Sequence, residues 1–325
     1  MKKLPISLNF SKLVVTKRLT AIALRMRNFM TNFARILQIC KEFAGNRVND
    51  LGNIPRRGVV PKFSDLEVVA LSITAEAFGF DSENLLLYRL HKECKDDLPH
   101  LVSRRQFNAR RKLTARLAEE IRKDVAMAVD GGEDVFCIDS KPVKVCQNAR
   151  AKRCAMGRDN IEAAPDWGFC ASQKMYYYGY KLHAVCGIRG VIHSYDITAA
   201  SVHDLRYLED VKWEYHDCMM LGDKGYLSAQ VQQNLFDFAN ISLEVPYRLN
   251  QKKWRPPSWS YKRFRKRIET IFSQLNDNIM MMRNYAKQSC GLFTRIAGKI
   301  AAMTFMQYVN FINHRPIGQI KYSLI

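Results

Sequence analysis

A short apolar run that ends on a carboxylate constrains this chain most. Residues 135–138 read Val-Phe-Cys-Ile, which is typical of a buried strand, and Asp139 follows at the expected strand end. A carboxylate at such a place costs folding free energy unless it is paired, and a divalent cation is a common partner. Asp223 follows a second apolar run, and Glu269 lies in a basic amphipathic segment. We therefore treat Asp139, Asp223 and Glu269 as candidate ligands of one metal site.

The charge of the chain points to a polyanionic partner. The 325 residues contain 51 Lys and Arg against 31 Asp and Glu, a formal net charge of +20. DNA or RNA is the usual partner of such an excess, and the alternative is a basic protein that is merely soluble. The 9 cysteines are odd in number and form no Cys-x-x-Cys pair, which disfavours a zinc ribbon and favours a reducing cytoplasm. No apolar run reaches the length of a membrane span.

The first 130 residues are predicted to be helical and basic. Residues 1–59 form a basic, mostly helical arm, with a helix over 21–43 and no Asp or Glu before residue 41. That composition also resembles an organelle transit peptide, but the overall charge favours an arm on DNA. Residues 60–130 form a helical DNA-binding region with helices over 64–77, from 81 onward and over 103–129. Either a helix-turn-helix module or a supporting helical cap accounts for this pattern. The expected phosphate contacts are Arg104, Arg105, Arg110 and Arg111.

Residues 131–313 have the pattern of an α/β domain that begins with antiparallel strands, and residues 314–325 form a basic tail. Strands are expected at 176–186 and 191–198 as a hairpin, and at 218–221 and 241–246. Helices are expected at 201–208, 229–239, 258–282 and 294–312, and residues 144–174 as a long loop. His183 is expected to be packed or hydrogen-bonded. Tyr176–Tyr178 are interpreted as sheet surface rather than a platform for bases, and Trp254 and Trp259 as either packed or stacked on a base.

The three acids suit phosphodiester chemistry when they act together. Two Mg²⁺ ions roughly 4 Å apart activate the attacking oxygen and stabilise the leaving oxygen, and carboxylates hold such ions. Taken singly, each acid is more often a turn, cap or ion-pair residue. In this interpretation Asp139 bridges the ions, and nearby cations hold the DNA backbone. Those cations are Lys141, Lys224, Arg263, Arg265, Lys266 and Arg267.

Four segments resemble the consecutive motifs of bacterial DDE transposases. Among these transposases, they resemble the insertion-sequence family nine-eighty-two most strongly. They are residues 138–143 (IDSKPV), 178–183 (YGYKLH), 222–226 (GDKGY) and 267–272 (RIETIF). Asp139, Asp223 and Glu269 match the catalytic acids of that family. One departure is that Lys262 and Asn276 replace the Tyr and Lys that many relatives carry around the last acid, whereas Arg265 is kept.

The resemblance implies an RNase H-like mixed sheet flanked by helices, two Mg²⁺ ions that Mn²⁺ can replace, and a homodimer. It also implies cleavage and strand transfer at the terminal inverted repeats of an insertion sequence, joining to target DNA, and a cytoplasmic, nucleoid-associated protein. Two alternatives stay open. One is a related metal-dependent nuclease or recombinase, and the other is a DNA-binding protein without catalysis.

Overall fold

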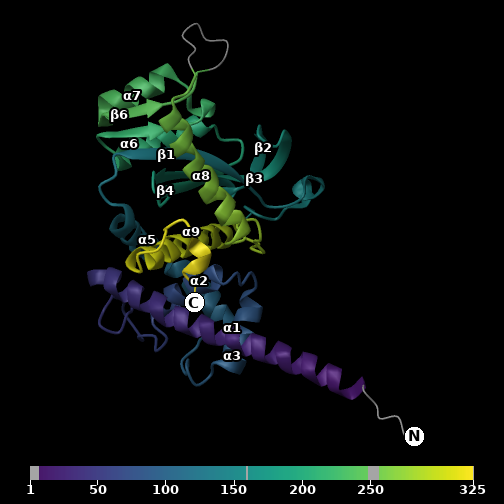
Figure 1. Cartoon of the computed structure of the whole chain (residues 1–325). Coiled ribbons are helices and arrows are strands. Elements are labelled where there is room, and N and C mark those ends of the chain that lie inside the picture. Colours follow the sequence, from purple (N-terminus) through teal and green to yellow (C-terminus); the bar gives the residue numbers. More distant parts are fainter. Residues whose placement is uncertain (1–6, 159, 248–255, 325) are drawn as a thin grey trace. The chain divides into compact units, whose positions relative to one another are not determined.

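The computed structural model describes the chain except residues 1–6, 159, 248–255 and 325, and it describes no side chains for residues 7–25 and 260. The predicted base-stacking role of Trp254 therefore lies outside the described residues. The chain forms two compact units, residues 1–114 with 324–325, and residues 115–323. Figure 1 shows the helices of the first unit in purple and blue, and the sheet of the second in teal and green.

The first unit is helical, as expected. It contains α1 (Ser7–Ala44), α2 (Asp65–Ala77), α3 (Glu83–Glu93) and α4 (Arg104–Leu113). Phe29 of α1 packs edge-on against Phe78 and Phe80 after α2, with ring centroids 5.3 and 5.5 Å apart. Ser64 and Glu67 form the capping box that starts α2, since each side chain accepts a hydrogen bond from the other's backbone N–H.

The helix predicted over 103–129 is wrong as one continuous element. The structure breaks it at Thr114, which ends α4, and α5 (Ala115–Asp130) begins at the next residue. The two units also divide at this point, whereas the sequence placed a boundary near residue 131. Val129 and Ala126 of α5 pack with Val191 of the second unit, so tertiary burial assigns α5 to that unit.

A mixed sheet forms the centre of the second unit, which confirms the predicted fold class. Its strands are β1 (Val135–Lys144), β2 (Asp166–Cys170), β3 (Met175–Gly187), β4 (Ile192–Ala199), β5 (Cys218–Leu221) and β6 (Ile241–Glu244). The order is β2-β3-β1-β5-β6, and β4 pairs with β3 beside β2. The β1–β3, β2–β3 and β3–β4 pairs are antiparallel, and β1–β5 and β5–β6 are parallel.

Helices flank this sheet. Phe136 and Ile138 of β1 pack in a core with residues of α6 (Leu208–Glu214) and α7 (Ala229–Ala239). Cys137 points the other way, because its thiol lies 3.3 Å from the carbonyl oxygen of Phe264 on α8 (Trp259–Asp277). The long α9 (Ser289–Ile312) packs against α5. Within the described residues, no helix is both long and apolar enough to cross a membrane.

Three further predictions need correction. Asp139 does not end its strand, because β3 pairs with β1 from Phe136 to Lys144, and only the pairing with β5 stops at Cys137. The expected loop over 144–174 contains β2 and two short 3₁₀ helices, Asn148–Arg153 and Ile161–Ala163. The helix expected at 201–208 is a 3₁₀ turn, Asp204–Tyr207, that continues into α6. For Asp139 the deciding partner, β3, is distant in sequence, whereas β2 pairs with the neighbouring β3 across a short turn.

Candidate active site

Asp139 projects from β1 toward α8, where Arg265 meets it. An Arg265 guanidinium nitrogen lies 3.0 Å from Asp139 Oδ2, and the other donates to the Ile138 carbonyl at 2.8 Å. The Asp139 side chain is only 18% exposed. Burial raises its pKa to about 6, with a further contribution from the charge of Asp223, although Arg265 and the Ser140 N–H act in the opposite direction. Asp139 is therefore a carboxylate whose ionised form stays costly even beside Arg265.

Asp223 lies beside Asp139 because of the parallel pairing of their strands. The β1–β5 register ends with Cys137 opposite Leu221, so each acid follows the last paired residue by two positions. Asp223 begins the 3₁₀ turn Lys224–Tyr226, and its Oδ1 accepts a hydrogen bond from Gly225 N at 2.7 Å. Adjacent parallel strands therefore bring two carboxylates that are distant in sequence to one place.

Glu269 is exposed on α8, one helical turn beyond Arg265. It lines, together with Asp223, a groove of about 920 Å³ that also includes Lys224, Trp259 and Tyr261. The hydroxyl of Tyr261 donates to the Gly222 carbonyl, which fixes the start of α8 against the loop that carries Asp223. In the part of the chain that the structure describes, no three Asp, Glu, His or Cys side chains form a ready metal cluster. The structure thus brings Asp139 and Asp223 together and places Glu269 along the groove.

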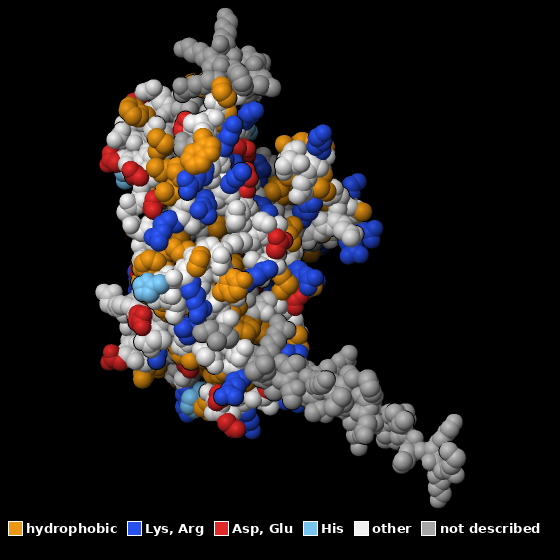
Figure 2. All heavy atoms as spheres, in the orientation of Figure 1, with side chains coloured by type: hydrophobic (Ala, Val, Ile, Leu, Met, Phe, Trp, Pro, Cys, Tyr) orange, Lys and Arg blue, Asp and Glu red, His pale blue; other side chains and the backbone are white. Residues whose placement is uncertain are grey.

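Cations surround this groove, and Figure 2 shows blue Lys and Arg side chains gathered over the region of α8. Lys224, Arg263, Lys266 and Arg267, four of the residues predicted to bind DNA, are exposed. Arg263 stacks on Trp259, with its guanidinium 5.2 Å from the ring centroid.

The other two predicted cations of this region have partners within the protein. Arg265 is buried and pairs with Asp139. Lys141 is half-buried, lies 5.6 Å from the centre of the Phe272 ring, and has a pKa that burial lowers.

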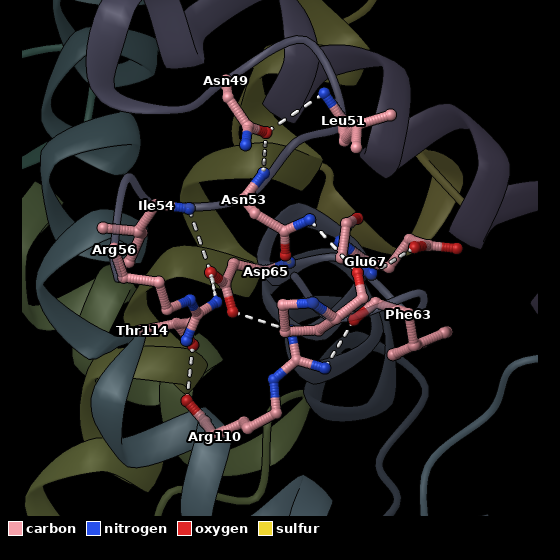
Figure 3. Close-up of polar contacts among 12 residues, drawn as sticks. Asn49, Leu51, Asn53, Ile54, Arg56, Phe63, Asp65, Glu67, Arg110 and Thr114 are labelled. Carbon is pink, nitrogen blue, oxygen red and sulfur yellow. Dashed lines mark hydrogen bonds and ion pairs between the residues drawn. The ribbon is translucent and has the colours of Figure 1, made fainter. Parts of the chain in front are cut away.

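The α4 arginines divide into two kinds. Arg104 and Arg105 are exposed at the start of the helix. Arg110 instead pairs with buried Asp65 at 2.7 Å, as drawn in Figure 3. Burial raises the pKa of Asp65, but hydrogen bonds from Arg110 and Arg56 outweigh it, so that the pKa is lowered overall.

Arg111 is also engaged inside the first unit. Its side chain is 5% exposed and pairs with Glu76 at 2.6 Å and Glu83 at 3.5 Å. The structure thus places Arg110 and Arg111 in ion pairs that hold the helices of the first unit together.

Asp204 is an acid of this region that the sequence did not single out. Its Oδ1 accepts hydrogen bonds from Ser140 Oγ at 3.2 Å and Lys181 Nζ at 3.0 Å. A Cβ at Gly225 would lie 2.9 Å from Asp223 Oδ1 and 3.4 Å from Asp204 Oδ2, so this glycine leaves room for both carboxylates. In the sequence, an acid at the start of a short helix is usually a capping residue. Asp204 differs because the pairing of β1 with β3 brings Ser140 and Lys181 together to donate to it.

Two buried polar groups complete the surroundings. His183 is fully buried, as expected, and its Nε2 lies 2.9 Å from Thr198 Oγ1. Burial lowers the pKa of His183 to about 4. The Tyr226 hydroxyl is buried and has no hydrogen-bond partner among the described residues. Burial raises the pKa of Tyr226, and the charges of Asp204, Asp139 and Asp223 raise it further. A buried donor without a partner beside three carboxylates suits a site that an additional oxygen ligand or a water enters.

The donor set fits a hard divalent cation. Asp139 and Asp223 supply carboxylate oxygens, which Mg²⁺ prefers, and their mutual repulsion falls when a cation lies between them. Glu269 and Asp204 are further carboxylates in the same region.

Comparison with known proteins agrees with this chemistry. Residues 130–305, more than half of the chain, match the family described as Transposase DDE domain. The matched region contains Asp139, Asp223 and Glu269. No curated protein and no solved structure matches the chain.

Proposed function

Because the chain belongs to the transposase DDE domain family, we propose that it cleaves and joins DNA at the ends of a bacterial insertion sequence. The observation that supports this most is the pair Asp139 and Asp223, which parallel strands place side by side next to a groove lined by cations and Glu269. The finer assignment, to the insertion-sequence family nine-eighty-two, rests on the four sequence motifs.

We assign Asp139, Asp223 and Glu269 as the residues that hold two Mg²⁺ ions, which Mn²⁺ can replace. When bound, such ions activate the attacking oxygen and stabilise the leaving oxygen of a phosphodiester. Arg265 is the counter-ion of half-buried Asp139 in the metal-free protein and offsets part of the cost of ionising it. The place of Glu269 in the groove and its motif support its assignment.

The side chains proposed to contact DNA are the exposed lysines and arginines of both units. Arg263 and Lys266 of α8 line the groove, Arg267 is exposed on the same helix, and Lys224 follows Asp223 directly. These side chains are suited to hold the phosphates that flank the scissile bond. Arg104 and Arg105, in the helical first unit, are suited to contact phosphates of the terminal inverted repeat. A homodimer that joins two element ends to target DNA, acting at the nucleoid in the cytoplasm, completes the proposal.

The test is cleavage and joining of labelled DNA that carries the element's ends, in the presence of Mg²⁺. Asp139→Asn keeps the shape of the side chain and removes its charge. Asp237→Asn, an exposed acid on α7, is the matched control. We expect wild type and control to cut and join, and Asp139→Asn to bind the DNA without cutting it.

Each alternative gives a different result. Cleavage without any joined product would identify a nuclease. Binding without cleavage by the wild type, with or without Mg²⁺, would identify a DNA-binding protein without catalysis. Equal activity of wild type and Asp139→Asn would remove Asp139 from the metal site.

A further inference from the structure

An exposed row of aromatic side chains covers one face of β2 and the first part of β3. Trp167 lies opposite Tyr178 and Phe169 opposite Tyr176, with ring centroids 5.5 and 5.0 Å apart. Trp167 is 44% exposed, Phe169 53% and Tyr176 65%. We call these four side chains the aromatic platform. A group of exposed large apolar side chains of this kind marks an interaction surface.

The platform is not needed for the core. Tyr177, between the two platform tyrosines, is 1% exposed and packs with Cys170 and Ala200 on the opposite face of the strands. That face also packs closely, since a Cβ at Gly168 would lie 2.6 Å from the Ala200 carbonyl oxygen. The alternation therefore separates a packed face from an aromatic face turned to solvent. The expectation that Tyr176–Tyr178 form sheet surface holds for Tyr176, which is exposed, but not for buried Tyr177.

Basic residues border the platform. The 3₁₀ helix Asn148–Arg153 is tied to β3, because the Asn148 side chain donates to the Tyr176 carbonyl at 2.9 Å. Lys144 Nζ lies 3.2 Å from the sulfur of Met175, the residue before Tyr176. Residues 144–178 contain six cations against the acids Asp159, Glu162 and Asp166; the cations are Lys144, Arg150, Lys152, Arg153, Arg158 and Lys174. Figure 2 shows blue side chains next to orange ones on the lobe that contains β2.

A second exposed aromatic pair in the same unit provides a contrast. Trp213 of α6 and Phe238 of α7 have ring centroids 4.8 Å apart and are 68% and 48% exposed. Their exposed sequence neighbours are mainly acidic, namely Glu209, Asp210, Glu214 and Asp237. Lys212 lies 5.5 Å from the centre of the Phe238 ring, but it pairs with Glu209. Exposure of aromatic rings is thus common to both pairs, and an excess of positive charge in the surrounding sequence distinguishes the platform.

We propose that the aromatic platform binds unpaired bases of single-stranded DNA. Every base has a π-face that stacks on Trp, Tyr or Phe, and flanking cations hold the backbone. The two ring pairs are two residues apart along the strands, or roughly 7 Å, so they can receive separate bases of an opened strand. The inference rests on the proposed function for its biological setting, in which a DNA end is opened and cut. It concerns residues separate from the groove beside Asp223.

The experiment measures binding of a labelled oligo(dT) and of a blunt duplex of unrelated sequence by fluorescence anisotropy, with the full-length protein. The test variant is Phe169→Leu/Tyr176→Leu, which keeps apolar side chains but removes both π-faces. The matched control is Trp213→Leu/Phe238→Leu. We expect the test variant to bind oligo(dT) at least about tenfold more weakly, with duplex binding changed less than about threefold. The control should bind both DNAs as the wild type does.

A test variant that binds oligo(dT) as tightly as the wild type would overturn the platform. An equal loss of affinity for both DNAs would also contradict the proposal. If oligo(dT) binding stayed unchanged but self-association in sedimentation velocity were lost, the platform would be a contact with a second copy of the chain. Far-UV circular dichroism and the unfolding midpoint verify that the leucine variants fold. Cleavage of the element ends by the wild type is measured separately, so failure of the platform and failure of the proposed function give different results.

Discussion

Asp139 carries an electrostatic cost that its proposed role explains. Its folded-state pKa of about 6 lies above the ordinary value of 3.8, so the folded protein binds this proton more tightly than the unfolded chain. Stability is greatest at low pH with respect to this group, and it falls as the pH rises from about 4 through 6. A carboxylate retained at such a cost is typical of a functional site.

We therefore expect Asp139→Asn to stabilise the metal-free protein while abolishing cleavage. The gain in the free energy of unfolding should be about 2–3 kcal/mol at pH 8 in EDTA and close to zero at pH 4. Urea unfolding at the two pH values measures it. A variant that is less stable than the wild type at pH 8 would mean that the ion pair with Arg265 outweighs the cost of burial.

The contribution of His183 to stability should have the opposite pH dependence. Its folded-state pKa of about 4 lies below the ordinary 6.5, so its contribution to stability is complete above pH 6.5 and is lost as the pH falls to 4. The wild type should lose about 2–3 kcal/mol relative to His183→Gln across this window, as measured by urea unfolding of both proteins. A constant difference between them from pH 7 to pH 4 would contradict the buried, neutral imidazole.

Asp204 is expected to support the metal site without contacting the DNA. Asp204→Asn keeps the hydrogen-bonding shape toward Ser140 and removes one negative charge next to Asp223. The Mg²⁺ concentration for half-maximal cleavage should rise about 10- to 100-fold, as is usual when a residue that supports metal ligands is changed. DNA affinity without metal should stay the same. An unchanged Mg²⁺ titration would limit Asp204 to a structural contact.

At the scale of elements, α4 combines two uses of arginine on one helix. Arg104→Gln/Arg105→Gln should weaken DNA binding and reduce the slope of log K against log salt by about 2, because each exposed arginine contacts one phosphate. Its unfolding midpoint should match that of the wild type. Salt titrations by anisotropy measure this slope, and an unchanged slope would show that this end of α4 does not contact DNA.

Arg111→Met on the same helix should instead destabilise the first unit by about 3–5 kcal/mol, because it removes the guanidinium that pairs with buried Glu76. Urea unfolding of this variant is the measurement, and Arg116→Met, whose side chain is 91% exposed, is the control. A loss of DNA affinity without destabilisation would contradict the structural role of Arg111.

At the scale of the whole molecule, the net charge of +20 predicts steep salt dependence. A protein that contacts 6–10 phosphates loses roughly 10³- to 10⁵-fold in affinity between 50 and 200 mM salt. We expect a loss of at least about 10³-fold for duplex DNA of unrelated sequence, measured by anisotropy. A change below about tenfold would mean that most of the charge serves solubility.

The sequence by itself determined the features that depend on near neighbours. The capping residues Ser64 and Glu67 predict the start of α2, and the bounds of β5 and α7 agree with the predicted 218–221 and 229–239. The motifs around Asp139, Asp223 and Glu269 led to the transposase DDE domain, and the charge to a polyanion. Capping, periodicity and composition act over a few residues, so one chain read in order contains them.

Only the tertiary structure decided which groups meet. The pairing of β1 with β3 extends the strand past Asp139 and brings Ser140 to Asp204. Arginines in similar basic stretches of the sequence have different roles. Arg265 and Arg111 form ion pairs with Asp139 and Glu76, whereas Arg104 is exposed. The aromatic platform also exists only because β2 pairs with β3. The β1–β3 and arginine contacts join residues far apart in the chain, and the platform joins residues across a hairpin. The energies of all these contacts depend on burial, which local sequence does not specify.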